Sequence, residues 1–132
     1  MGEAADLVRR AFERFNAGDV DGLVELFDPE VEFQDVPVIP GSGVYTGRDG
    51  MRRWYEVVNE PLEDLSFEFG DCTEAGDAVA VLTTARGRGR GSGAEVEWRF
   101  STTWRIRDGR IVHHRGHVDH ADAVRKIGAG PG

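Results

Sequence analysis

A short stretch near the N-terminus constrains the fold more than any other part of the chain. Residues 7–15 carry apolar side chains at helical spacing, and a Gly-Asp turn separates them from a second helical pattern over residues 23–27. An Asp-Pro pair ends that pattern, and residues 31–35 then alternate between apolar and polar side chains, as in a half-buried strand. This order predicts a small α+β unit whose first strand ends at the carboxylate of Asp35.

The remaining chain divides into one further long helix, several strands and a short closing helix. Pro and Gly residues predict an irregular loop over residues 36–45, and residues 46–62 carry an apolar helical face that Pro61 limits. Four later segments alternate like strands and are joined by turn residues: 65–74, 78–86, 94–106 and 110–118. Residues 120–127 predict the closing helix. Helices followed by antiparallel strands predict one α+β domain over residues 4–127, with residues 128–132 as a flexible tail.

The bulk composition excludes several classes of function. The chain has 132 residues and a formal net charge of −8, so phosphate groups would be repelled and we expect no nucleic-acid partner. No apolar run is long enough to cross a membrane, and the first residues lack the apolar core of a signal peptide. Cys72 is the single cysteine and forms no disulfide within the chain. We therefore expect a cytoplasmic protein that does not bind membranes.

Three stretches together resemble the nuclear transport factor 2-like superfamily, in particular its SnoaL-like and ketosteroid-isomerase-like branch. They are FNAGDVDGLVELFDPEVEFQD (15–35), GVYTGRDGMRRWY (43–55) and DGRIV (108–112). The resemblance implies a curved antiparallel sheet wrapped around the N-terminal helices, a cystatin-like α+β barrel that forms a cone with an apolar pocket. It also implies a homodimer through the outer sheet face. This fold hosts isomerases, cyclases, hydrolases, dehydratases and binding proteins, so the fold alone assigns no activity.

The resemblance singles out Asp35 for chemistry. Asp35 falls on the general-base position of ketosteroid isomerases, and Tyr55 falls on the supporting tyrosine of that family. In an apolar cavity, desolvation raises the pKa of a carboxyl group and suits it to proton abstraction. The two oxyanion donors of those enzymes correspond here to Ala11 and Thr102, which argues against steroid isomerisation by their mechanism. The alternative is that Asp35 is a strand-end residue that caps the following loop.

His114 is the second candidate for a catalytic role. Strand alternation points its side chain into the pocket, and SnoaL-like cyclases carry a histidine at the corresponding place. Those cyclases and the limonene epoxide hydrolases also place an acidic residue in the last strand, where this chain has Gly116. Two interpretations of His114 stay open: an acid or orienting partner of Asp35, and a neutral imidazole hydrogen-bonded inside the pocket.

The four histidines near the C-terminus do not predict a metal site. His113 and His117 share a strand face but lie about 13 Å apart in an extended strand. No metal-binding motif accompanies them. We expect His113, Arg115 and His117 on the outer sheet face, where a dimer partner would pack.

The glycine–arginine stretch over residues 86–93 is typical of RNA-binding segments when taken alone. Because it lies between two strands of an acidic protein, we interpret it as a mobile hairpin whose arginines neutralise nearby carboxylates. Arg86, nearest to the strand, is positioned to reach the pocket mouth and attract an anionic ligand.

Aromatic side chains complete the predicted pocket, which suits a small apolar ligand of cyclic or planar shape. Its predicted lining is Phe33, Trp54, Tyr55, Trp98, Phe100, Thr102 and Trp104. Two functions follow. The first is an isomerase, cyclase or lyase that uses Asp35 and His114 without a metal or organic cofactor. The second is a non-catalytic ligand-binding or dimeric accessory module with a vestigial site.

Overall fold

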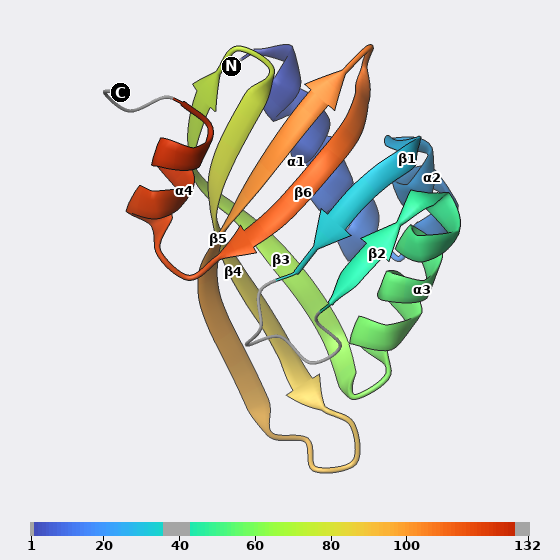
Figure 1. Ribbon diagram of the computed structural model, residues 1–132. Coiled ribbons are helices and arrows are strands. Elements are labelled where there is room, and N and C mark those ends of the chain that lie inside the picture. Colours follow the sequence, from blue (N-terminus) through green and yellow to red (C-terminus); the bar gives the residue numbers. More distant parts are fainter. Residues whose placement is uncertain (1, 36–42, 129–132) are drawn as a thin grey trace.

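One six-stranded sheet forms the framework of the fold (Figure 1). The structure is a computed structural model that describes residues 2–35 and 43–128. In spatial order, the strands are β2 (Val44–Thr46), β1 (Phe27–Gln34), β6 (Arg110–His117), β5 (Glu95–Arg107), β4 (Ala78–Gly89) and β3 (Leu62–Ala75). β1 and β6 pair in parallel, whereas the other neighbouring pairs are antiparallel. We expected a wholly antiparallel sheet, and the parallel β1–β6 pair differs from that expectation. The antiparallel meander from β3 to β6 ends with β6 next to β1 and running in the same direction.

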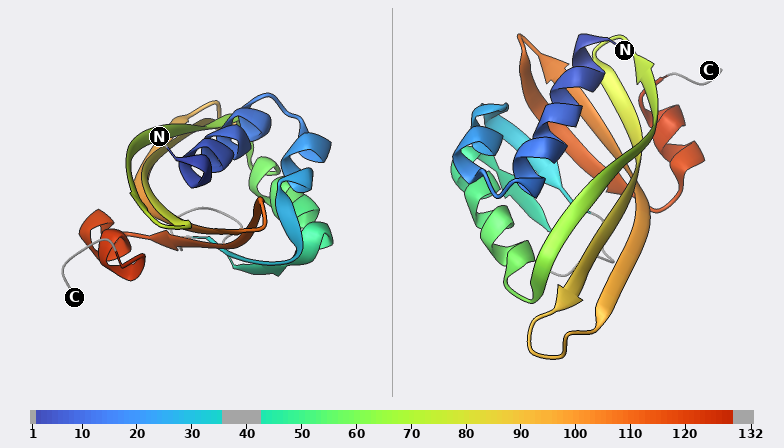
Figure 2. Two further views of the ribbon diagram at one scale, coloured as in Figure 1. Left: turned by 90° about the horizontal axis from the view of Figure 1, so that it is seen from above. Right: turned by 180° about the vertical axis from the view of Figure 1, so that it is seen from behind.

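Helices cover both faces of this sheet. The described part of the chain contains α1 (Glu3–Asn16), α2 (Val20–Glu25), α3 (Gly47–Asn59) and α4 (His120–Lys126). Seen from above, the sheet curves around α1, while α4 lies outside the curve (Figure 2). The predicted α+β class, with a curved sheet wrapped around N-terminal helices, is thereby confirmed. None of the described helices has the length and apolar character needed to span a bilayer.

The apolar stripe of α1 faces the concave side of the sheet. Its buried members are Ala4, Ala5, Leu7, Val8, Ala11, Phe12 and Phe15. The side chain of Asn16, at the end of α1, fixes the helix to β3 through two hydrogen bonds. Asn16 Nδ2 donates to the carbonyl of Phe67 across 2.8 Å, and the Phe67 amide donates to Asn16 Oδ1 across 2.9 Å. These two hydrogen bonds fix the position of the C-terminal end of α1 relative to β3.

The Gly-Asp turn behaves as its sequence predicts. Gly18 has a φ of +73°, a left-handed conformation that glycine adopts without steric cost. Asp19 caps α2 by accepting a hydrogen bond from the Gly22 amide across 2.9 Å. This turn orients α2, so that β1 begins directly after it.

Several element boundaries differ from the sequence-based expectation. Phe27 belongs to β1 rather than to the second helix, because it pairs with Ile111 of β6 and its carbonyl accepts a hydrogen bond from Arg48 Nε. Leu62 begins β3 instead of extending the helical face. β2, which pairs with the end of β1, was not predicted within the loop 36–45. Residues 36–42 of that loop and residues 129–132 of the predicted tail lie outside the described residues.

The glycine–arginine stretch forms the end of β4 and the turn that leads into β5, so the predicted hairpin is present and its first half is strand. β4 continues to Gly89, with Arg86 opposite Glu97 and Arg88 opposite Glu95 in β5. Arg86 of β4 forms ion pairs with Glu68 of β3 and with Glu97 of β5. These opposite charges on the three neighbouring strands explain why β4 continues into the glycine–arginine stretch. The expectation that Arg86 reaches the pocket mouth is wrong, since its guanidinium lies on the outer face among these carboxylates.

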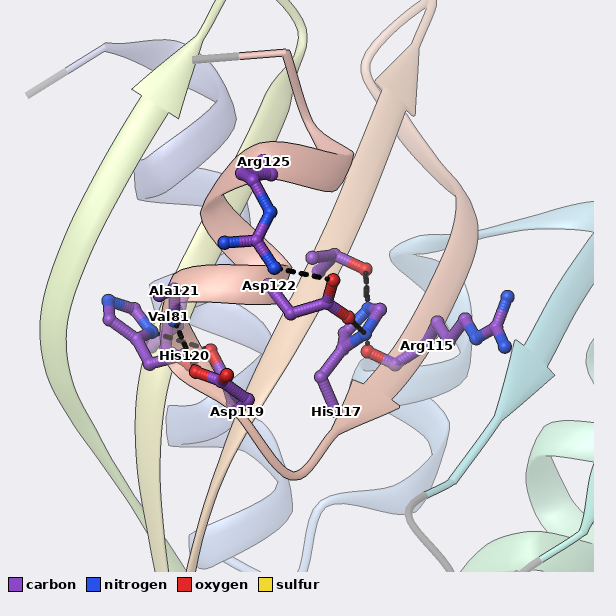
Figure 3. A network of polar contacts seen from close by, with 10 residues as sticks. Val81, Arg115, His117, Asp119, His120, Ala121, Asp122 and Arg125 are labelled. Carbon is purple, nitrogen blue, oxygen red and sulfur yellow. Dashed lines mark hydrogen bonds and ion pairs between the residues drawn. The ribbon is translucent and has the colours of Figure 1, made fainter. Parts of the chain in front are cut away.

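α4 packs on the outer face of the sheet, where Ala123 and Ile127 form a small apolar cluster with β4 residues Ala78 and Ala80. Polar contacts hold the helix in place (Figure 3). Thr103 Oγ1 lies 3.0 Å from His117 Nε2, and His117 Nδ1 lies 3.8 Å from Asp122 Oδ2.

The position of α4 corrects one expectation about the outer face. His117 is 8% exposed and lies beneath α4, so it does not stand open to a dimer partner. His113 is half-buried and Arg115 is exposed, and both keep the predicted outward orientation.

Candidate functional site

A cavity of about 40 Å³ lies between α1, α3 and the concave face of the sheet. Its wall is mainly aromatic: Phe12, Phe15, Phe27, Phe33, Trp54, Phe67, Phe100 and Trp104. Ala11 and Leu23 complete its apolar part, and the polar side chains on the wall are Asp35, Thr83, Thr102 and His114. Asp35 is the acidic residue of this wall, and neither arginine nor lysine is among the wall residues that the structure describes.

Asp35 follows directly on the last residue of β1, Gln34. Its side chain is 6% exposed, and Oδ2 accepts a hydrogen bond from the indole Nε1 of Trp54 across 2.9 Å. Its backbone amide donates to the Gly43 carbonyl, which holds the strand end beside the β2 entry. The result is a buried carboxylate on an aromatic wall, an arrangement that can accept a proton from a bound molecule.

His114 of β6 stands opposite Phe33 of β1 in the parallel ladder. The two rings stack, with centroids 3.9 Å apart and planes inclined by 9°. Trp104 packs edge-on against the same imidazole with centroids 4.3 Å apart. The His114 side chain is 3% exposed, so its orientation is set by the aromatic rings around it.

The imidazole of His114 is neutral at physiological pH. Burial lowers its pKa to about 3, and the neighbouring His113 acts in the same direction. A backbone hydrogen bond from the ring to Gln34 opposes this shift without reversing it. An imidazolium proton donor is therefore not present near pH 7. Nδ1 is buried and has no hydrogen-bond partner among the described residues.

A second polar group lies on the β4–β5 part of the wall. Trp104 Nε1 donates to Thr102 Oγ1 across 2.8 Å, and Thr102 Oγ1 lies 3.2 Å from Thr83 Oγ1. The Thr83 hydroxyl also lies within hydrogen-bonding distance of the Val81 carbonyl. These donors thus have acceptors inside the sheet. Ala11 and Thr102, which correspond to the oxyanion donors of ketosteroid isomerases, both lie on the wall but present no uncommitted donor to the cavity.

A metal site has no support in the described residues. They contain no group of three or more histidine, cysteine, aspartate or glutamate side chains placed to hold a metal ion.

The sequence model of the SnoaL-like domain matches residues 8–114, which is most of the chain. The chain belongs to the SnoaL-like domain family. No curated protein matches this SnoaL-like protein. The match ends at His114, so it covers both Asp35 and the last cavity residue along the chain.

Solved structures of nuclear transport factor 2-like and related proteins share the fold of this SnoaL-like protein. An NTF2-like protein of unknown function from Burkholderia pseudomallei is 24% identical with a TM-score of 0.79, over 96% of this chain and 98% of that one. TerC, co-crystallised with polyporic acid, is 19% identical with a TM-score of 0.78, over 96% and 99%. A Mycobacterium tuberculosis protein in complex with estradiol-17beta-hemisuccinate is 16% identical with a TM-score of 0.75, over 90% and 95%. At these identities, the likeness establishes the fold alone.

The structure brings together seven of the nine side chains predicted for the site: Phe33, Asp35, Trp54, Phe100, Thr102, Trp104 and His114. Tyr55 and Trp98 are not on the described wall of this SnoaL-like domain. Tyr55 follows Trp54 on α3 and is turned by about 100° around the helix axis, so its ring packs on Phe15 instead. Trp98 lies on the side of Phe100 that leads to the β4–β5 turn, and its side chain is half-buried against the core.

Several wall residues were not predicted as part of the site. Phe12 and Phe15 were recognised only as the buried face of a helix, because periodicity does not distinguish core from cavity wall. Thr83 had a usable signal: it is a polar residue on a strand face otherwise made of Val79, Val81 and Ala85. A lone hydroxyl in such a row points toward a polar partner or a cavity.

Proposed function

We propose that this SnoaL-like protein binds a small apolar ring compound in the aromatic cavity and that Asp35 accepts a proton from it. The observation that carries the proposal is the buried Asp35 carboxylate on a wall of eight aromatic side chains. A carboxylate in this setting suits removal of a proton from carbon next to a carbonyl group, the step shared by isomerase, cyclase and lyase chemistry. That chemistry requires no metal or organic cofactor.

The wall limits the ligand to a neutral molecule. A ligand carboxylate would meet the negative charge of Asp35, and no described wall residue would compensate it. The cavity of about 40 Å³ is also smaller than the roughly 150 Å³ that accepts a benzene ring. Binding a ring therefore requires aromatic side chains to move outward. The ring compounds named for TerC and for the Mycobacterium tuberculosis protein support the choice of a ring ligand.

A second function, non-catalytic binding in the same cavity, is favoured by a specific observation. Proton abstraction next to a carbonyl builds negative charge on oxygen, and losing one donor for that charge typically costs about 3–4 kcal/mol of transition-state stabilisation. Here the indole donors of Trp54 and Trp104 are already bonded to Asp35 and Thr102. His114 is neutral, so it offers no imidazolium group to that charge.

Hydrogen–deuterium exchange of a ring ketone separates the two functions. The α-protons of 2-tetralone are followed by NMR in D₂O with wild type, Asp35→Asn and the matched control Glu32→Gln, an exposed acid on the other face of β1. For the catalytic function, wild type and Glu32→Gln accelerate exchange, and Asp35→Asn falls to the uncatalysed rate while still binding the ketone. Binding without accelerated exchange in wild type would leave the binding function in place.

Assembly and location form part of the same proposal. We propose a homodimer through the outer sheet face next to α4, where Gln34 and Arg115 are exposed, and a cytoplasmic location, which suits the unpaired thiol of Cys72. Sedimentation at micromolar concentration is expected to give twice the chain mass of 14.5 kDa. A single species at the chain mass would refute the dimer.

A further inference from the structure

The imidazole of His114 leaves one buried hydrogen-bonding atom unused. Nδ1 has no partner in the part of the chain that the structure describes, although 97% of the side chain is shielded from solvent. Buried polar atoms in folded proteins are nearly always hydrogen-bonded, because leaving one unpaired forfeits its interaction with water. An exception on the wall of a cavity indicates that the partner is a molecule inside the cavity.

The chemical character of that partner follows from the position of the ring proton. A neutral imidazole carries one proton, and the ring makes a hydrogen bond to the backbone of Gln34. We assign that proton to Nε2, because Nδ1 has no hydrogen-bond partner among the described residues. Nδ1 therefore presents a lone pair and accepts hydrogen bonds.

The ring cannot easily turn to reverse these roles. Stacking on Phe33 at 3.9 Å and edge contact with Trp104 at 4.3 Å hold its plane. Protonating Nδ1 is also disfavoured, because burial lowers the pKa of the imidazole to about 3. His114 is thus a fixed acceptor over the physiological pH range.

We propose that Nδ1 of His114 accepts a hydrogen bond from a ligand hydroxyl group, so that the cavity selects neutral ring compounds bearing a phenolic or enolic O–H. This inference rests on the proposed ligand-binding function and adds the polar group of the ligand. A ligand carbonyl at this point would place oxygen lone pairs against the lone pair of Nδ1. A carboxylate would in addition meet Asp35, whose side chain shares the wall.

Phenol and toluene test the inference, because they match in shape and differ by a hydroxyl in place of a methyl group. 2-Naphthol and 2-methylnaphthalene form a larger pair of the same design. Dissociation constants are measured for wild type, for His114→Phe, which keeps the aromatic stack without the acceptor, and for the control His113→Phe on the outer face. The ratio of the methyl-compound Kd to the hydroxyl-compound Kd is expected to be about tenfold larger in wild type and His113→Phe than in His114→Phe.

A second readout needs no variant. In wild type labelled with ¹⁵N-histidine, phenol is expected to shift the Nδ1 resonance of His114 toward the value of a hydrogen-bonded acceptor, and toluene is expected to leave it unchanged.

The outcomes separate this inference from the function on which it rests. If both members of a pair bind with a ratio that His114→Phe does not change, or if phenol binds without moving the Nδ1 resonance, the hydroxyl inference is overturned and ligand binding stands. If no member of either pair binds wild type, both are overturned.

Discussion

The indole nitrogen of Trp54 donates a hydrogen bond to the carboxylate of Asp35 across 2.9 Å, in a region closed to solvent. The contact joins α3 to the end of β1 and fixes the direction of the carboxylate. Hydrogen bonds to a charged group contribute more than neutral ones, about 1.5–3 kcal/mol each. Asp35 is therefore both a candidate for chemistry and part of the packing between helix and sheet.

Trp54→Phe is expected to lower the free energy of unfolding by about 2–4 kcal/mol, because it removes this donor and leaves space in the core. Urea denaturation of wild type, Trp54→Phe, Asp35→Asn and the double variant measures the coupling between the two side chains. We expect a coupling free energy above about 1 kcal/mol. Additive effects of the two substitutions would show that the hydrogen bond contributes nothing to stability.

Acid is expected to destabilise the protein through His114. Its folded-state pKa of about 3 lies below the ordinary value of 6.5, so the unfolded chain binds a proton that the folded chain refuses. The stability contributed by the neutral ring is complete above pH 6.5 and is lost as the pH falls toward 3. At pH 5 the loss amounts to about 2 kcal/mol.

Urea denaturation at pH 7 and pH 5 measures this loss. His114→Phe is expected to lose about 2 kcal/mol less stability than wild type between the two pH values. The lowered pKa of His117, which also arises mainly from burial, adds a loss common to wild type and His114→Phe. Equal losses in wild type and His114→Phe would contradict a neutral buried imidazole.

The contact of Thr103 with His117 beneath α4 gives a third prediction. Thr103→Val removes the hydroxyl that lies 3.0 Å from His117 Nε2 and leaves that nitrogen without its partner. We expect a loss of about 1–3 kcal/mol in unfolding free energy. Thr103→Ser keeps the hydroxyl and is expected to lose less than Thr103→Val in the same denaturation experiment. The reverse order would show that the methyl group of Thr103, rather than its hydroxyl, stabilises this contact.

The resemblance to SnoaL-like proteins and ketosteroid isomerases, combined with the two-residue period of a strand, predicted the positions of Asp35 and His114. Because the side chain of Phe33 faces the core, Asp35, two residues later, faces the same way. His114 pairs with Phe33 across the β1–β6 ladder, so its side chain lies on the same face of the sheet. The same periodicity does not report what covers the outer face. The burial of His117 under α4 therefore came only from the structure, since it depends on contacts between distant segments.

The sequence patterns also predicted neither the short strand β2 nor the full length of β4. β2 has three residues and exists through pairing with β1, so it carries no periodicity of its own. β4 was expected to end where glycines begin, yet ion pairs of Arg86 and Arg88 with acids on neighbouring strands extend it. Tertiary contacts outweigh local propensity at such positions.

The three tryptophans of the chain offer the most direct test of the central claim, that the aromatic cavity is a ligand site. Trp54 and Trp104 lie on its wall, and Trp98 lies outside it. During titration with 2-tetralone, the indole N–H signals of Trp54 and Trp104 are expected to shift with one common affinity while that of Trp98 stays in place. In Ala11→Phe, which fills the cavity from α1, these shifts are expected to vanish. Unmoved Trp54 and Trp104 signals in wild type, or identical shifts in Ala11→Phe, would contradict the account.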